Sequence, residues 1–384
     1  MQTRKILFKT LGALIAVAVL LALLPGSHVQ ADPSTITVCA SGCDYTTIQA
    51  AIDAANAGDT IAVGEGSYII TSSINVNKSL TIEGAGPDKT EVRFQNISDY
   101  GYVFFVTAAS DVTLSDMTVG ATNYLDRKGY FIGGPDGGFI TTQNLVIDNI
   151  TFDGGRSAIM ISGEGQVVKN SHFTGEWLRA SIRVTATDFL ITNNLFECLH
   201  YQFGPVEIEG GNQTAGEISH NIMRNGAIPG YFKTNGNVFT LEFYGGTGTG
   251  NLVIKNNVFD GITNDPGVPN DSGKYVRKLA IYFEGNNFDG SKIFIQDNDF
   301  FGYNVTAVYA PGPTTITGNE FSDNLTHVWL YNAGTGIPAG AIESIFASNT
   351  FDKATFFDGG SRIYSSIQAA IAAAADGDTI EVAA

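Results

Sequence analysis

A short phrase recurs through the middle of this 384-residue chain: an apolar strand-like run, an Asn, one further residue, and then a Phe or Met. The clearest copies read LITNNLF, ISHNIM, VIKNNVF, FIQDNDF, TITGNEF and IFASNTF, at Leu190–Phe196, Ile218–Met223, Val253–Phe259, Phe294–Phe300, Thr315–Phe321 and Ile345–Phe351. Looser copies precede them at Val112–Val119, Leu145–Phe152 and Val167–Phe173. The Phe residues at 152, 173 and 196 are 21 and 23 residues apart. A period in the low twenties, in units too small to bury their own apolar faces, predicts a solenoid of stacked coils.

Each copy is interpreted as a strand, a bend at the Asn, and an inward Phe that stacks on the Phe of the next coil. Asn suits the bend because its amide tolerates a left-handed backbone and bonds locally, and stacked amides also bond each other along the axis. Alternation of apolar and polar residues fixes which side chains enter the coil. Composition agrees, since 45 Gly, 25 Phe and only 15% charged residues are typical of a turn-rich all-β protein with a long core.

The phrases IQAAIDAA, GDTIAV and SLTIEGAGPDKT follow residue 46. Together with the repeats they resemble the opening of the right-handed parallel β-helix superfamily, the pectin-lyase-like fold, and the resemblance covers nearly the whole chain after residue 31. It implies an all-β, right-handed parallel β-helix solenoid with a short N-terminal capping helix. It matches no specific enzyme family, and one fold hosts many activities.

The first 31 residues predict a secretory signal peptide. Arg4, Lys5 and Lys9 precede an apolar run over 11–24, and small residues end at Ala31. A retained membrane anchor is the alternative, although the run is short for a membrane span. We therefore expect a secreted or cell-surface protein that has no membrane contact once the signal peptide is removed.

The remaining chain is strongly acidic. The full sequence carries a formal charge of −17, and loss of the three basic residues of the signal peptide takes it to −20. Such a surface repels nucleic acid and anionic lipid, so neither is expected as a partner. An acidic polyuronate would need calcium to bridge like charges, whereas a neutral glycan needs no cofactor.

Three cysteines are too few for a disulfide framework. Cys39 and Cys43 are expected to close a small loop outside the cytoplasm, which leaves Cys198 over. No His or Cys cluster lies near this pair, so we assign no zinc site there.

The segment Tyr45–Val63 predicts a short amphipathic helix that covers the N-terminal end of the solenoid. Thr46 and Gln49 form a capping box, and Ile48 and Ile52 share one helical face.

The same opening returns near the other end, where Tyr364–Val382 is identical to Tyr45–Val63 at 13 of 19 positions. We therefore expect a signal peptide at 1–31, a parallel β-helix at 32–360, and the truncated start of a second β-helix, with its cap helix and first strand, at 361–384. This organisation implies a monomer within a longer multidomain chain.

Seven further short strands align between the Asn phrases: SAIMISG, ASIRVTA, PVEIEGG, TLEFYGG, AIYFEGN, TAVYAPG and HVWLYNAG. If their branched residues point inward, one column of side chains points outward: Met160, Arg183, Glu207, Glu242, Tyr282, Tyr309 and Trp329. A second outward column lies two residues further on: Ser162, Thr185, Glu209, Tyr244, Glu284, Pro311 and Tyr331. The middle coils are thus expected to expose carboxylates, and the later coils aromatic rings. Loops rich in turn residues are expected to wall a groove beside this face, at Asn123–Gly138, Gly226–Asn237, Asn264–Gly273 and Gly334–Gly340.

Sugars need that mixture of side chains, because their C–H faces stack on aromatic rings while carboxylates accept hydroxyl hydrogen bonds or perform acid–base work. We assign catalysis to Glu207, Glu242 and Glu284. We assign substrate binding to the residues around them: Arg183, Glu209, Tyr244, Tyr282, Tyr309, Trp329 and Tyr331. Neighbouring strands lie about 4.8 Å apart, which suits a retaining glycosidase pair, whereas strands two apart, at about 10 Å, suit an inverting pair. No metal site is assigned.

Two alternatives remain open. The acidic face is a solvated surface in which Arg183 only pairs with Glu207, or the protein is a non-catalytic surface or adhesion module, which the second cap favours. Pectate lyases, which this fold resembles, use an acidic calcium-binding cluster together with an Arg. The nearest matches to that pattern are Asp148, Asp153 and Arg156, or Glu176, Arg179 and Arg183. Neither set forms a recognisable motif. The signatures of pectinesterases and polygalacturonases do not occur in the sequence. The sequence predicts a secreted β-helix protein that binds an extracellular polysaccharide, with glycoside hydrolysis or elimination as the candidate activity.

Overall fold

The computed structural model describes residues 33–108, 110–200, 203–209, 215–227, 237–244, 250–261, 277–285, 288–334, 336–357 and 360–382. The predicted signal peptide, the predicted loop Asn264–Gly273 and most of the loop Gly226–Asn237 lie outside the described residues. Residues 34–384 form one compact unit. Of the helices in the described ranges, none is long and apolar enough to cross a membrane.

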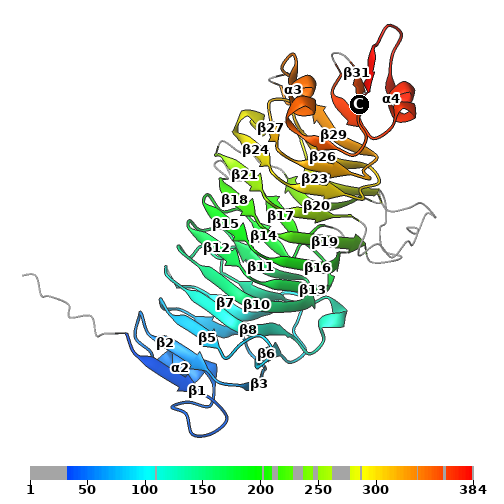
Figure 1. Ribbon diagram of the computed structural model, residues 1–384. Helices are drawn as coiled ribbons and strands as arrows, with labels where there is room; N and C mark the ends of the chain where they lie inside the picture. Colours follow the sequence, from blue (N-terminus) through cyan, green and yellow to red (C-terminus); the bar gives the residue numbers. More distant parts are fainter. Residues whose placement is uncertain are drawn as a thin grey trace, which may run out of the picture. The chain divides into compact units, whose positions relative to one another are not determined.

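Parallel strands on three faces build a stack of coils within this unit (Figure 1). The first face consists of β1 (Thr35–Val38), β2 (Thr60–Val63), β5 (Thr81–Gly84), β8 (Thr113–Ala121), β10 (Val146–Gly155), β12 (Gln166–Lys169), β15 (Phe189–Thr192), β18 (Gly216–Ser219), β21 (Leu252–Lys255), β24 (Ile293–Gln296) and β27 (Thr315–Thr317). The second face consists of β3 (Gly66–Ile70), β6 (Thr90–Phe94), the later halves of β8 and β10, β13 (His172–Trp177), β16 (Leu195–His200), β19 (Ile222–Ala227), β22 (Val258–Asp260), β25 (Asp299–Phe301), β28 (Glu320–Ser322) and β30 (Thr350–Phe351). Because β8 and β10 run through both faces, the two join in one 20-stranded sheet of the described residues.

The third face is a separate sheet, with 13 strands in the described part of the chain. Its parallel strands are β4 (Ile74–Val76), β7 (Tyr102–Val106), β9 (Tyr130–Gly133), β11 (Ser157–Ile161), β14 (Ile182–Val184), β17 (Val206–Glu209), β20 (Asn237–Tyr244), β23 (Arg277–Phe283), β26 (Thr306–Pro311) and β29 (Thr326–Tyr331). Short 3₁₀ turns lie at η1 (Tyr124–Asp126) and η2 (Gly290–Lys292). Three parallel faces wound in chain order make a right-handed parallel β-helix, which confirms the predicted fold.

A ladder of stacked asparagines lies at the turn between the first and second faces. Asn221 accepts hydrogen bonds at Oδ1 from both the backbone N–H and the side-chain amide of Asn194, at 2.9 and 3.0 Å. The same pair of bonds, at 2.8–3.0 Å, links each later member to the next, in the order Asn221, Asn257, Asn298, Asn319 and Asn349. Stacked amides therefore bond along the axis, as the repeated phrase predicted.

In four clear copies of the phrase the left-handed residue is the one before the ladder asparagine, which corrects the expectation for these copies, whereas in two looser copies the Asn itself is left-handed as expected, with φ of 52° at Asn149 and Asn170. Asn193, His220, Asn256 and Asp297 all have φ between 54° and 56°. The ladder Asn is held instead by its bonds to the backbone on either side: Asn257 Nδ2 donates to the carbonyls of Ile218 and Lys255. The bend therefore uses two consecutive residues: the first takes the left-handed backbone conformation, and the second, the ladder Asn, holds the turn with its side-chain hydrogen bonds.

Inward aromatic rings stack along the coil interior, as predicted. Phe152, Phe173 and Phe196 have ring centroids 5.0 and 4.6 Å apart. Phe259, Phe300, Phe321 and Phe351 continue the stack at 4.7, 5.0 and 5.1 Å.

One predicted strand is a helix. The phrase IFASNTF contributes Asn349 and Phe351 to the two stacks, but its first residues belong to α3 (Ala341–Ser348). Ile342 and Ile345 are three residues apart and both are buried, which is the spacing of one helical face.

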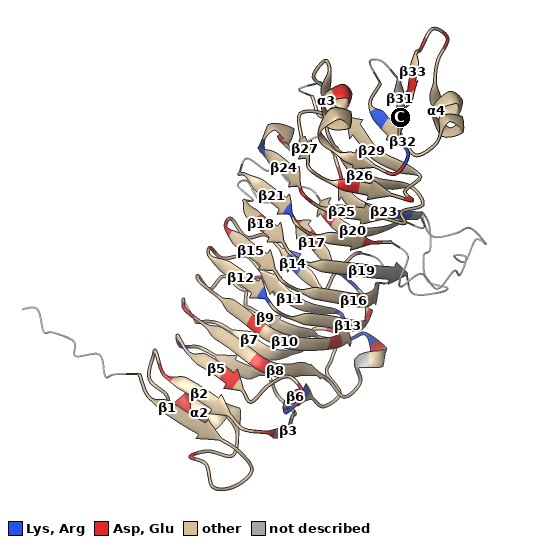
Figure 2. Ribbon diagram, in the orientation of Figure 1, with Lys and Arg blue, Asp and Glu red and all other residues tan. Residues whose placement is uncertain are grey.

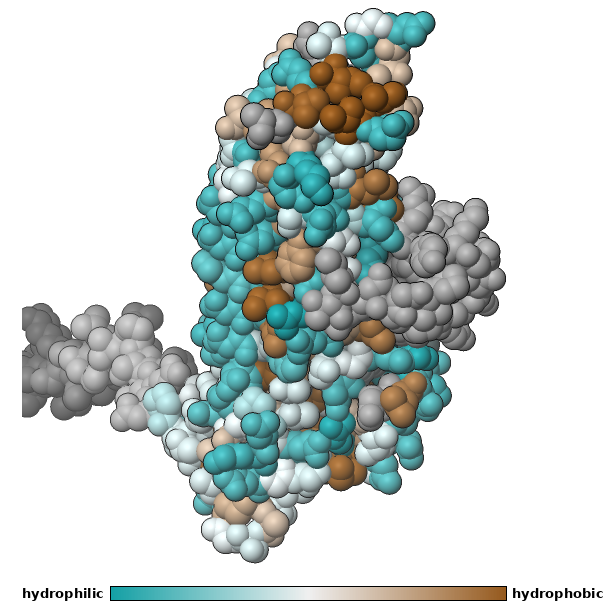
Figure 3. All heavy atoms as spheres, turned by 45° about the vertical axis from the view of Figure 1, so that its right-hand side comes forward, coloured by the Kyte–Doolittle hydropathy of each residue, from teal (hydrophilic) through white to brown (hydrophobic). Residues whose placement is uncertain are grey.

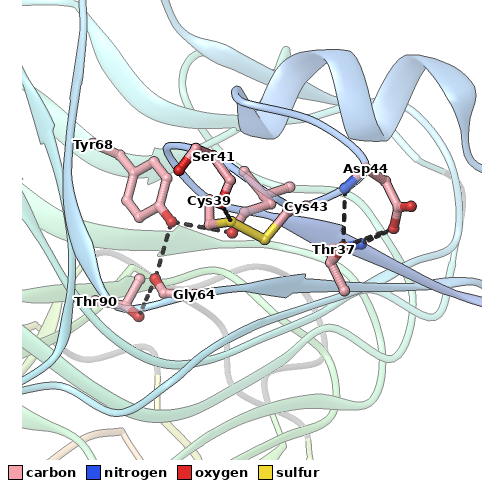
Figure 4. Close-up of a disulfide and its surroundings, with 9 residues drawn as sticks. Thr37, Cys39, Ser41, Cys43, Asp44, Gly64, Tyr68 and Thr90 are labelled. Carbon is pink, nitrogen blue, oxygen red and sulfur yellow. Dashed lines mark hydrogen bonds between the residues drawn. A yellow bond between two sulfur atoms is a disulfide. The ribbon is translucent and has the colours of Figure 1, made fainter.

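At the N-terminal end, α2 (Ile48–Ala54) packs Ile48 and Ile52 into the core, as predicted. Its N-cap is Thr47, whose side chain accepts from the N–H of Ala50, so the cap lies one residue later than expected. Cys39 and Cys43 form the expected disulfide, and Figure 4 shows it beside the carboxylate of Asp44, which accepts from Thr37 of β1. Tyr68 donates to the carbonyls of Val38 and Gly64 in the same region. Cys198 is free and buried.

At the C-terminal end the pairing direction changes. β32 (Arg362–Tyr364) pairs antiparallel with β29, and β31 (Thr355–Phe357) pairs antiparallel with both β32 and β33 (Ile380–Val382). The second copy of the cap phrase forms α4 (Ile367–Ala373), with Ser366 as its N-cap. The terminal segment therefore contains a helix and a strand, and that strand, β33, pairs antiparallel, whereas β2 of the first copy pairs parallel.

Candidate functional site

The predicted outward column on the third face is present in full. Strand register pairs Met160 with Arg183, Arg183 with Glu207, Glu207 with Glu242, Glu242 with Tyr282, Tyr282 with Tyr309, and Tyr309 with Trp329. The register holds because branched or aromatic residues on either side of each outward residue are buried in the coil, as Val206 and Ile208 are beside Glu207. Two pairs of the second column also follow directly: Glu209 with Tyr244, and Pro311 with Tyr331.

The two central carboxylates are not on an exposed surface, which corrects the expectation of a solvent-facing strip. Glu207 is 2% exposed and Glu242 is 3% exposed. Tyr244 is 51% exposed, and Glu284 is also exposed. Period-two alternation gives the direction in which a side chain leaves its strand, but it carries no information on what covers that side chain. The candidate site therefore has a buried acidic pair, Glu207 and Glu242, beside a more exposed part, here called the rim, that consists of Tyr244 and Glu284.

Arg183 holds two carboxylates of the column. Its Nε lies 3.1 Å from Glu207 Oε2, and its Nη2 contacts Glu209. The guanidinium also lies over the ring of Phe139, 5.3 Å from the centroid. Burial raises the pKa of the Glu207 carboxyl, while the positive charges of Arg183 and Arg179 act in the opposite direction. The pairing of Arg183 with Glu207 is present as considered, in a buried rather than a solvated setting.

Glu242 has no such compensation. Its Oε2 atom is buried and has no hydrogen-bond partner in the described part of the structure. Burial, followed by the negative charges of Glu207 and Glu284, raises the pKa of the Glu242 carboxyl to about 9. The two neighbouring carboxyls therefore differ in environment: burial raises the pKa of both, but the positive charges of Arg183 and Arg179 oppose the rise at Glu207, whereas the charges near Glu242 add to it.

The column becomes aromatic in the later coils. Tyr282 stacks on Phe239 at 4.3 Å and on Tyr309 at 5.2 Å, and Tyr309 stacks on Tyr331 at 4.8 Å. Tyr331 donates from its hydroxyl to the carbonyl of Gly285 at 2.8 Å. Much of each ring face is therefore taken up by the next ring, while each of the three tyrosines stays partly exposed.

Trp329 is placed differently from expectation. Its ring is covered by the guanidinium of Arg362, 3.4 Å from the centroid. Arg362 lies directly opposite Trp329 in the antiparallel pairing of β29 with β32. This face of the indole is occupied by the protein itself and does not stack on a sugar.

The sets suggested by the resemblance to pectate lyases are dispersed into separate contacts. Asp148 pairs with Lys169, and Asp153 pairs with Arg93. Arg156 donates to the Tyr130 hydroxyl. In the second set Glu176 pairs with Arg127, whereas Arg179 lies over the ring of Phe203. Among the described residues, no group of three or more His, Cys, Asp or Glu side chains is placed to hold a metal ion.

One contributor to the site, Phe239, was not identified from the sequence, and Arg179 was named only in a set suggested by the resemblance to pectate lyases. Phe239 precedes Glu242 by three residues and stacks on Tyr282, and Arg179 acts electrostatically on Glu207. Alternation would turn Phe239 inward with Leu241 and Phe243, so it gave no signal for a place beside Tyr282. Arg179 lies before its strand, where no alternation applies.

Charged residues are distributed over all three faces (Figure 2). The view in Figure 2 shows no extended basic patch on the described residues, in keeping with the acidic composition. Fold and column together define the class: a parallel β-helix protein with a buried acidic pair and an aromatic stack on its third face.

No protein-family model matches the sequence, and no curated protein matches it by sequence comparison. Similar solved structures include pectin methylesterase from carrot, with a TM-score of 0.46 and 12% identity over 69% of this chain and 89% of that chain. Pectin methylesterase PemA from Erwinia chrysanthemi has a TM-score of 0.43 and 11% identity over 65% of this chain and 89% of that chain. The catalytic domain of a GH87 α-1,3-glucanase in complex with nigerose has a TM-score of 0.39 and 16% identity over 85% of this chain and 69% of that chain. Identities this low leave the activity of this chain unassigned.

Proposed function

We propose that this protein binds a neutral extracellular polysaccharide on its third face and hydrolyses it with Glu242 and Glu207. The observation that carries the proposal is the Glu242 carboxyl, which lies opposite Glu207 on the neighbouring strand, is 3% exposed, and leaves one oxygen unpaired. A buried polar atom without a partner is costly, so it calls for a partner such as an ordered water or a ligand. A glycosidic oxygen or sugar hydroxyl is a suitable partner for a protonated carboxyl.

The roles follow from the two environments. Glu242, whose pKa is raised to about 9, stays protonated at neutral pH and can donate to the leaving oxygen. Glu207, ion-paired with Arg183, acts as nucleophile or base. Parallel strands lie about 4.8 Å apart, so this pair favours the retaining mechanism. Glu284 acts through its charge and at the exposed rim, rather than as a partner two strands away.

Substrate binding falls to the rim and the aromatic rings. Tyr244 is half exposed and lies directly opposite Glu209, and Tyr282, Tyr309 and Tyr331 continue in the direction of the later coils. The acidic charge of the chain disfavours a polyuronate, which would need calcium to bind. We therefore expect the substrate to be a neutral extracellular polysaccharide.

The test is a screen of neutral and uronate polysaccharides, with and without calcium. Reducing ends report hydrolysis, and ultraviolet absorbance of unsaturated products reports elimination. Glu242→Gln and Glu207→Gln are each expected to reduce turnover by about 10²–10⁴-fold. Glu217→Gln, which removes a partly exposed carboxylate paired with Lys255 on the first face, is the matched control and should leave turnover unchanged. Turnover that survives Glu242→Gln would show that the residue assignment is wrong.

The competing function is a non-catalytic surface or adhesion module. The second cap at α4 and the deep burial of Glu207 and Glu242 favour it. This function would be supported if a glycan bound with the same affinity to the wild type and to the Glu207→Gln/Glu242→Gln double variant and neither protein turned it over.

A further inference from the structure

The two copies of the cap phrase adopt the same local structure in different surroundings. In the first, the Asp59 carboxylate accepts from the N–H of Asn56 at 2.8 Å, and in the second the Asp378 carboxylate accepts from the N–H of Ala375 at 2.7 Å. Helices α2 and α4 are both seven residues long and both are capped by a hydroxyl at the equivalent position. The sequence therefore determines the cap itself, whichever neighbours surround it.

Burial separates the two copies. Ile48, Ile52 and Val63 are 3%, 0% and 2% exposed in the first copy. Their equivalents Ile367, Ile371 and Val382 are 49%, 51% and 54% exposed. Figure 3 shows apolar side chains gathered at the end of the unit that carries the C-terminal elements. Three large apolar residues left open on one small cap form an incomplete surface.

The first copy shows what completes such a surface. Ile74, Val76 and Leu80 of the following coil are buried in the same core cluster as Ile48 and Ile52. Gln49 accepts from the N–H of Asn75 at 2.7 Å, and so pairs with β4 as a neighbouring strand would. These contacts require an extended chain with apolar residues at alternate positions.

Two further contacts of the first copy have no counterpart in the second. Lys78 Nζ donates to the carbonyls of Ile52, Asp53 and Ala55 at the end of α2. Among the described residues, no side chain donates to the equivalent carbonyls at the end of α4. Strand β2 pairs on both edges, with β1 and with β5, whereas β33 lies at the end of its sheet. An open strand edge presents unpaired backbone groups that another strand can complete.

We propose that the face formed by Ile367, Ile371 and Val382, together with the free edge of β33, is a docking surface for a coil of another β-helix. The coil carries apolar residues at alternate positions and a Lys that reaches the end of α4, as residues 74–80 do at α2. Gln368 takes the part that Gln49 plays in the first copy. The surface is independent of the saccharide site, which lies on other coils.

The experiment appends residues 64–121 of this chain after Val382, where the repeat continues in the first copy. Ile371→Cys provides a thiol probe in both the appended and the unmodified chain. Cys39 and Cys43 are joined and Cys198 is buried, so the new thiol is the reactive one of the four. Docking is expected to slow its alkylation by about tenfold or more, because only local opening then exposes it.

The matched control is the same fusion with Ile74→Asp and Val76→Asp in the appended copy, which should label at the rate of the unmodified chain. Equal labelling of fusion and control overturns the proposal. Concentration-dependent protection of the unmodified chain also overturns it, because residues 74–80 of a second copy are already covered by its own α2 and a different surface would then be the occupant. If the fusion does not fold, a synthetic peptide of residues 64–84 is titrated into the full chain. Saturable binding that Ile371→Asp abolishes supports the proposal, and no such binding overturns it.

Discussion

Two sets of polar side chains are stacked in register on the same coils, and they differ in how well they are satisfied. In the asparagine ladder each amide accepts from one neighbour and donates to the next at 2.8–3.0 Å. On the third face Glu207 and Glu242 lie opposite each other in strand register, but two carboxyls cannot both be ionised there without cost, and one oxygen of Glu242 has no partner in the described part of the structure.

The difference separates a structural stack from a stack that is a candidate for function. An amide is both donor and acceptor, so repetition along the axis reinforces itself. A carboxylate is only an acceptor, so repetition raises the free energy of the folded state unless a proton or an Arg intervenes. The scaffold keeps Glu242 in an unfavourable place that no contact among the described residues compensates, and such places are candidates for function.

The largest expected effect comes from breaking the ladder. Asn257→Asp replaces a donor to Ile218, Lys255 and Asn298 by a carboxylate that faces three acceptors. We expect the free energy of unfolding to fall by about 3–5 kcal/mol, because a buried charge is left unpaired. Asn256→Asp is the matched control, since its side chain is exposed and Asp tolerates its left-handed backbone. Chemical denaturation of both variants measures the contrast, and equal losses would contradict it.

The next effect concerns the pH dependence of stability. The unfolded Glu242 loses its proton near 4.5 and the folded one near 9, so the folded state holds the extra proton between these values. Stability therefore decreases as pH rises through this window. Glu242→Gln should remove this decrease and stabilise the protein at pH 8 by roughly 2–3 kcal/mol.

The pH prediction is measured by urea unfolding at several pH values. Glu217→Gln provides a control of opposite sign, because hydrogen bonds and the charge of Lys255 lower the pKa of the Glu217 carboxyl. If the stability of the Glu242→Gln variant depended on pH as strongly as that of the wild type, the Glu242 carboxyl would not be the cause of the pH dependence.

A smaller effect is expected from removing the cation between the carboxylates. Arg183→Met leaves Glu207 without its buried partner, and Glu207 escapes part of the cost by taking up a proton. We expect a loss of about 2 kcal/mol, partly restored in the double variant Arg183→Met/Glu207→Gln. A double-mutant cycle measures the coupling, and additive losses would argue against a functional pair.

The smallest effect is expected at the aromatic end. Tyr331→Phe removes the hydrogen bond to Gly285 and keeps the ring on Tyr309. A loss of about 1 kcal/mol or less should show in thermal unfolding, with the stack preserved. A much larger loss would mean that the hydroxyl supports more than this one carbonyl.

The sequence was sufficient for the fold and the register of the third face. Branched inward residues such as Ile182 and Val184 bury as a set, and a slip of one residue would expose all of them. The same reasoning correctly predicts that Glu207 lies opposite Glu242. What alternation could not supply was the cover over these residues, because burial depends on parts of the chain far away in sequence.

Local ambiguities explain the remaining differences. Thr46 and Thr47 both fit the start of a helix, and only the backbone geometry selects Thr47 as the cap. The four residues from Ile345 to Ser348 were too few to distinguish strand from helix, whereas the longer segment from Ala341 shows a helical face. The position of Arg362 over Trp329 results from the antiparallel pairing of β29 with β32. The repeats predict only parallel pairing, so this contact could not be predicted from them.

The ladder also bears on how this architecture accommodates change. Successive rungs are 21, 36 and 41 residues apart in sequence, yet the bonds between them have the same length to within about 0.1 Å. Each rung senses only its nearest neighbours, so extra residues inserted elsewhere on a turn leave it undisturbed. Inserted segments of different length can therefore be exchanged between coils while the ladder stays intact. Evolution or protein engineering could alter ligand preference in this way without changing the scaffold.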